Sequence, residues 1–173
     1  MGTDGTEVFP VSVGHSVTSD HQLARLLQIG IVLEEVVEAR AYHHHEEMGD
    51  DSLDEEIRNL LSHAAEESNE HRERLEAVID RLDVDSVPFE EIEALVEAQY
   101  GQTKPEDFDG VLYDQLCNEE TAYKFYDDLI GAVRASDVPF SVDRDQLLDT
   151  LVAIREEEAE GVEAVTKIME HRE

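Results

Sequence analysis

The chain has 173 residues, which is enough for one domain with a substantial core. Its 44 Asp and Glu against 13 Lys and Arg give a net charge of -31 at pH 7, so nucleic acid and anionic membranes are poor partners. Hydrophobic residues make up 40% of the chain, and their regular periodicity argues against acidic disorder.

The basic residues are mostly arginine, with Lys104, Lys124 and Lys167 as the only lysines. An acidic surface with few lysines is typical of a protein that works in concentrated salt, where a Debye length of ~3 Å at ~1 M screens self-repulsion. We therefore expect a halophilic protein. Cys117 is a single cysteine, which excludes an intrachain disulfide. No apolar run is long enough to span a membrane, and we expect no signal peptide. These features predict a cytoplasmic protein.

Residues 1–18 contain glycines, Pro10 and little periodicity, so we expect a tail or an extended arm there and a folded domain over residues 19–173. Capping signals mark three helix starts: Ser19 with Gln22, Ser52 with Glu55, and Asp143 with Gln146. Four long helices are predicted at about residues 20–48, 52–82, 111–135 and 143–171. A short helix at 88–100 is predicted within the connection 83–111.

Two long helices, a crossover and two more long helices predict an all-α four-helix bundle with one long connection. The second and fourth helices align without a gap when His71 is set against Gly161, and the first and third align when Glu35 is set against Glu119. The chain therefore has the pattern of a duplicated helical hairpin.

Polar residues interrupt the apolar stripes of three predicted helices. The stripe of the second helix contains Ser68 and His71, that of the third contains Glu119, and that of the fourth contains Glu158. Burying such groups costs on the order of 2–7 kcal/mol even for an uncharged polar group, unless the group is paired or binds a metal. We therefore expect something in the bundle core to satisfy them.

The first predicted helix is apolar on two faces. One face has an aliphatic arc (Leu26, Ile29, Leu33 and Val36), and the opposite face has Glu35 beside Ile31 and Tyr42. Two apolar faces on one helix favour packing in the bundle on one side and against a second subunit on the other, which predicts a homodimer.

Glu35, His71, Glu119 and Glu158 from four helices have the composition of a metal site for iron, manganese or zinc. These residues resemble the ferritin-like superfamily, and its rubrerythrin-like members most closely. The resemblance covers residues 22–170 and rests on Glu followed seven residues later by Tyr (Glu35 to Tyr42, Glu119 to Tyr126) and on the Glu-x-x-His positions of His71 and Glu158.

The resemblance implies a diiron-carboxylate site whose chemistry is oxidation of Fe(II) by peroxide or oxygen, or removal of peroxide. It also implies that Tyr42 and Tyr126 donate hydrogen bonds to the carboxylates. The chain departs from the family pattern at two ligand positions, because Ser68 replaces a glutamate and Gly161 replaces a histidine.

The departures predict at most one tightly held metal, with Ser68 beside the ligands. A second metal would bind weakly, if at all, through Glu67 or Glu38. The alternative is a non-enzymatic helical dimer that has lost its metals, in which His71 pairs directly with Glu119 or Glu158. The run His43-His44-His45 is a further candidate for a surface metal patch, but adjacent helical residues point about 100° apart, so the three cannot all bind one ion.

Overall fold

The computed structural model describes residues 16–47, 55–82, 84 and 110–171. The described residues form four α-helices: α1 (Asp20–Glu47), α2 (Glu55–Arg81), α4 (Gly110–Arg134) and α5 (Arg144–His171). The predicted all-α four-helix bundle is confirmed, and each helix boundary lies within three residues of its expected position. The expected short helix at 88–100 and the Ser52 cap lie outside the described residues.

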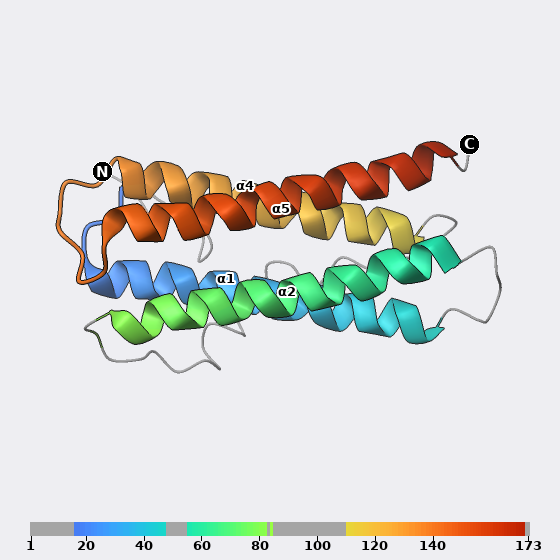
Figure 1. Ribbon diagram of the computed structural model, residues 1–173, viewed down its shortest axis with the longest axis horizontal. Helices are drawn as coiled ribbons and strands as arrows, with labels where there is room; N and C mark the ends of the chain where they lie inside the picture. The colour runs from blue at the N-terminus through green and yellow to red at the C-terminus, as the bar shows by residue number, and fades with distance from the viewer. Residues whose placement is uncertain (1–15, 48–54, 83, 85–109, 172–173) are drawn as a thin grey trace, which may run out of the picture.

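The bundle consists of two helical hairpins, α1 with α2 and α4 with α5, packed against each other (Figure 1). Contacts between the hairpins are made by α1 with α4 and by α2 with α5. Figure 1 shows that α2 and α4 run in the same direction, so α2 ends and α4 begins at opposite ends of the bundle. This is the topology of a bundle with one long crossover.

The start of α1 is held by a capping arrangement. The backbone N–H of Gln22 donates to Ser19 Oγ at 3.1 Å, and the side chain of Gln22 accepts from the backbone N–H of Thr18 at 2.7 Å. The first bond satisfies an N–H group that the first turn leaves without a partner, and the second joins the residue before the cap to the helix. Residues that were expected to belong to a tail also pack here, because Val17 is buried and its N–H donates to the carbonyl of Ala132 at 3.3 Å.

The turn between α4 and α5 is held by the first residue of α5. Arg144 donates to the carbonyls of Val133, Ser136 and Val138 at 3.0, 2.6 and 2.8 Å. Asp143 caps the helix as predicted, accepting from the N–H of Gln146 at 3.0 Å. The two ends of the turn are therefore fixed to each other.

The core consists of two apolar clusters with a polar layer between them. The larger cluster includes Leu27, Ile31, Leu75, Leu129 and Ile154, and the smaller one consists of Ala41, Ile57, Leu61, Leu112, Val165 and Ile168. Each helix passes from one cluster to the other, and a polar residue lies between: Glu34, His71, Glu119 and Glu158. The centre of the bundle is therefore a buried layer of ionisable groups.

The aliphatic arc of α1 is already covered within one chain, since Leu26, Ile29 and Leu33 are buried. The reason that the sequence offered for a homodimer, an exposed aliphatic face, is therefore removed, and the homodimer itself stays a prediction. No described helix combines the length and apolar character that crossing a bilayer requires.

Candidate metal centre

The polar layer brings together one ionisable side chain from each helix. Glu34 on α1 and His71 on α2 are 1% exposed, and Glu119 on α4 and Glu158 on α5 are 4% exposed. Carboxylates are almost never buried to this extent unless they are paired. The sequence-based expectation that His71, Glu119 and Glu158 lie in one buried layer agrees with this placement.

His71 is at the middle of the layer. Its Nδ1 lies 3.2 Å from Glu34 Oε2 and 3.2 Å from Glu158 Oε2, and its Nε2 lies 2.7 Å from Glu157 Oε1. One imidazole therefore contacts three carboxylates through two ring nitrogens.

The carboxylate from α1 is Glu34 and not Glu35, which differs from the sequence-based choice. Glu34 continues the buried stripe of Leu27 and Ala41 at seven-residue spacing, whereas Glu35 is half-buried outside the group around His71. The two residues point about 100° apart on the helix. Because α1 is apolar on two faces, periodicity alone did not fix its rotation.

The same one-residue shift changes the role of the tyrosines. Tyr126 is buried, and its hydroxyl donates to Glu34 Oε2 at 2.6 Å, so it contacts a carboxylate of the layer as predicted. Tyr42 is 60% exposed and lies away from the layer, because Ala41 takes the buried position. The prediction that Tyr42 donates to the buried carboxylates is wrong.

Gly161 and Glu119 share one space. A Cβ on Gly161 would lie 2.6 to 2.9 Å from the carboxylate atoms of Glu119. Gln115, buried one turn earlier, donates to Glu119 Oε2 at 2.8 Å, and Glu119 also hydrogen-bonds to Glu158. The carboxylate of Glu119 therefore fills the room that the missing side chain leaves.

Three members of the layer, His71, Glu119 and Glu158, have pKa values that are shifted upward. Burial alone would lower the pKa of His71, but its hydrogen bond to Glu34 and the neighbouring carboxylates raise that pKa to about 9. Burial raises the pKa of Glu158 well above its ordinary range, and the charge of Glu34 adds to this effect. Burial also raises the pKa of Glu119, and it raises the pKa of Glu67 to about 7. In the absence of another cation, the layer therefore retains protons.

Two groups of side chains among the described residues have the geometry to hold a metal ion. The inner group is Glu34, His71 and Glu158, and the outer group is Glu67, His71 and Glu157, with the ligand atoms of each group within 4.8 Å of one another. Glu34 Oε1 is buried and has no hydrogen-bond partner among the described residues. Carboxylate and imidazole donors with one unsatisfied buried oxygen fit a divalent ion.

Of the remaining residues predicted at the site, some lie in or beside the two metal-binding groups and one lies outside them. Glu67 lies in the outer group, and Ser68 is buried one turn before His71. Glu38 lies outside both groups, and it accepts a hydrogen bond from Arg72 at 2.6 Å.

Sequence reasoning missed the contact of Glu157 with His71 and a second buried polar cluster between α1 and α4. In that cluster Asp114 lies 3.0 Å from Arg40 Nη1 and 3.0 Å from His44 Nε2. The spacing of Arg40 and His44, one turn apart opposite Asp114 and Asn118, is the signal that could have indicated it. His44 is therefore buried in an ion-pair cluster, whereas His43 is exposed.

The comparisons with known proteins give no family. No protein-family model matches the chain, and no curated protein or solved structure matches it. The four-helix bundle and its Glu and His group are compatible with a ferritin-like fold.

Proposed function

We propose that the chain is a metal-carboxylate protein of the ferritin-like kind, which holds one divalent ion between Glu34, His71 and Glu158. The observation that carries the proposal is the inner group itself, three buried donors whose ligand atoms lie within 4.8 Å of one another. The unsatisfied Glu34 Oε1 supports it, because a buried carboxylate oxygen without a partner is costly and a cation would remove that cost.

The charges favour one ion over two. The carboxylates of Glu34 and Glu158 balance a single divalent cation when His71 binds as the neutral ring and Glu119 keeps a proton. Glu119 fills the space beside Gly161, where the resembled family has a further ligand. A second tightly held ion would have to displace that carboxylate.

Several residues would orient the ligands. Glu157 accepts a hydrogen bond from Nε2 of His71 when that nitrogen carries the proton, which would leave Nδ1 free to face the ion. Tyr126 donates to Glu34 and so fixes one of its oxygens. We propose iron or manganese as the ion, with zinc as a further candidate; iron or manganese would supply electron transfer to peroxide or oxygen.

A non-enzymatic helical module is the second candidate, and one observation favours it. His71 already contacts three carboxylates at 2.7 to 3.2 Å, so a protonated His71 is able to hold the layer together without a metal. Under this hypothesis the centre is a buried ion-pair network that fixes how the four helices pack.

Metal analysis of protein purified without a His tag or chelator, combined with His71→Ala, separates the two candidates. If an ion is bound, His71→Ala abolishes metal retention, and it lowers stability more in the absence of chelator than in its presence, since a ligand stabilises only the state that binds it. If His71 is instead the cation of an ion-pair network, the substitution strands buried carboxylates and costs on the order of 3–5 kcal/mol with or without chelator. Equal destabilisation in both conditions would exclude the metal site.

A further inference from the structure

The two nitrogens of His71 face two carboxylate groups at different depths. Nδ1 faces Glu34 and Glu158, whereas Nε2 faces Glu157 at 2.7 Å. Glu67 completes the outer group, with ligand atoms within 4.8 Å of one another. His71 is thus the one residue that belongs to both groups.

Exposure increases from the inner to the outer group. The side chains of Glu34 and Glu158 are 1% and 5% exposed, whereas those of Glu67 and Glu157 are 16% and 32% exposed. Glu67 lies on α2 and Glu157 on α5, two helices that pack against each other and occupy the near side of the bundle in Figure 1. An ion from solvent would therefore meet the outer carboxylates before the inner ones.

We infer that Glu67, Glu157 and Nε2 of His71 form an access site, where a divalent cation first exchanges water for protein ligands and displaces the Nε2 proton to solvent. When the ion moves on to Nδ1 in the inner group, Nε2 takes up a proton again and donates it to Glu157. The inference rests on the proposed function, because it requires an ion at the inner group. Two successive positions that share His71 let the ion lose its water in steps, without a fully desolvated charge between them.

Arg74 keeps the access site weak. Its Nη2 lies 3.6 Å from Glu157 Oε2, so a positive charge is already next to the outer carboxylates. A cation at the outer position would be repelled by this guanidinium, and an ion that binds weakly there can move on. The residence of the ion is therefore expected to be short in the outer group and long in the inner one.

Kinetics distinguish an access site from a group that only orients His71. An access site lies on the path in both directions, so its loss slows loading and release by the same factor and leaves the affinity unchanged. Loss of an orienting group weakens the affinity through faster release. Glu157 contacts Nε2, so it is able to act both as an access ligand and as an orienting group. The kinetics of a Glu67 variant therefore distinguish the two roles.

The experiment compares wild type with Glu67→Gln and uses Glu66→Gln as the matched control. Glu66 is the preceding residue on α2, is exposed, and undergoes the same substitution. Loading of Co²⁺ is followed by stopped-flow absorption, release by competition with chelator, and affinity by titration, all at a salt concentration at which circular dichroism shows the same helicity for each variant. We expect Glu67→Gln to slow both loading and release about tenfold at unchanged affinity, the low end of what focused charge does to the rate of encounter. Glu66→Gln should load as wild type does.

Arg74→Gln gives the opposite test, because removing its charge should speed loading. The access site is overturned if Glu67→Gln and Glu66→Gln load Co²⁺ at the same rate, or if Glu67→Gln weakens affinity by faster release alone. If wild type does not bind Co²⁺, or binds it as well after His71→Ala, the proposed function fails and the access site with it. If Co²⁺ binding is lost in His71→Ala but its rates are unchanged in Glu67→Gln, the access site is excluded and the proposed function stands.

Discussion

Gly161 shows how the absence of one side chain changes the composition of the centre. A glycine inside a helix normally costs about 1 kcal/mol relative to alanine. Here the carboxylate of Glu119 lies 2.6 to 2.9 Å from where the Cβ would be, and hydrogen bonds to Gln115 and Glu158 hold it there. The space of one potential ligand is therefore filled by another, which limits the centre to one ion in the proposed function.

Gly161→Ala and Gly131→Ala should change stability in opposite directions. Alanine at residue 161 would meet the Glu119 carboxylate at 2.6 to 2.9 Å and force it out of its hydrogen bonds, so we expect a loss of about 1–3 kcal/mol. Gly131 lies in α4 with nothing within 4 Å of the added methyl, so alanine there should stabilise by about 0.5–1 kcal/mol. Chemical denaturation at constant salt measures both. Equal stabilisation by the two variants would mean that Glu119 is not confined.

The raised pKa values of His71 and Glu67 make the metal-free protein less stable as the pH rises. A group whose pKa is raised on folding stabilises fully below its unfolded value, and that stability is lost as the pH passes its folded value. For Glu67 the loss falls between 4.5 and about 7, and for His71 between 6.5 and about 9. A bound metal has the opposite dependence, since it requires deprotonated ligands.

Melting temperatures in chelator should therefore fall from pH 5 to pH 9, whereas the increase in melting temperature that added metal produces should grow over the same range. His71→Gln should flatten the part above pH 6.5, and His63→Gln, at a histidine whose side chain is 74% exposed on the same helix, is the control. A melting temperature in chelator that does not change between pH 5 and pH 9 would contradict the buried, proton-retaining layer.

At the level of the helix, the sequence predicted what local signals determine. Capping residues such as Ser19 and Asp143 and the 3.6-residue period fixed where the four helices begin and end. The rotation of α1 about its axis was not predictable in this way. Because α1 has two apolar faces, its periodicity fits a core-facing Glu34 nearly as well as a core-facing Glu35. The contact of Glu157 with His71 depends on how α2 and α5 pack, which no local pattern contains.

The α1 and α4 pair depends on a buried acid that can be tested separately from the metal centre. Asp114 is 1% exposed and accepts from Arg40, with His44 on its other oxygen. Asp114→Ala leaves the Arg40 guanidinium and His44 without this partner, so we expect a loss on the order of 3–5 kcal/mol. Asp128→Ala breaks an exposed pair with Lys124 and should cost at most about 1 kcal/mol. Urea denaturation compares the two, and similar small losses would show that Asp114 does not hold α1 to α4.

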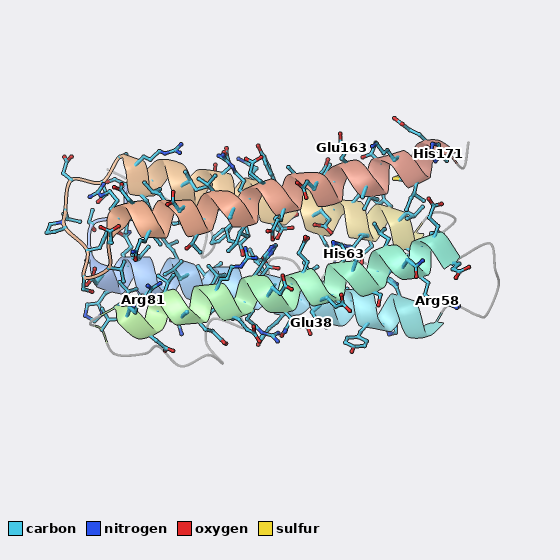
Figure 2. The ribbon with its side chains drawn as sticks, in the orientation of Figure 1. Glu38, Arg58, His63, Arg81, Glu163 and His171 are labelled. Carbon is cyan, nitrogen blue, oxygen red and sulfur yellow. The ribbon has the colours of Figure 1, made fainter. Side chains whose placement is uncertain are left out.

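At the scale of the molecule, charge opposes the fold that the core stabilises. The chain carries a net charge of -31, and acidic side chains such as Glu163 project from the bundle into solvent (Figure 2). The 13 Lys and Arg, among them Arg155 in its pair with Asp127 at 2.8 Å, are already counted in this net charge, so 31 negative charges remain in excess. Repulsion between the remaining carboxylates favours the expanded, unfolded chain, and its range is set by the salt concentration.

We therefore predict that helicity is lost when salt falls from ~1 M, where the Debye length is ~3 Å, to ~0.1 M, where it is ~10 Å. The loss would come from repulsion between carboxylates, which acts over a longer range when less salt screens it. Circular dichroism at a series of NaCl and KCl concentrations measures it, and screening requires that the two salts act alike at equal ionic strength. Unchanged helicity from 1 M to 0.1 M would remove the prediction of a halophilic protein. A dependence on K⁺ alone would point instead to binding of a specific ion, because screening does not distinguish the two cations.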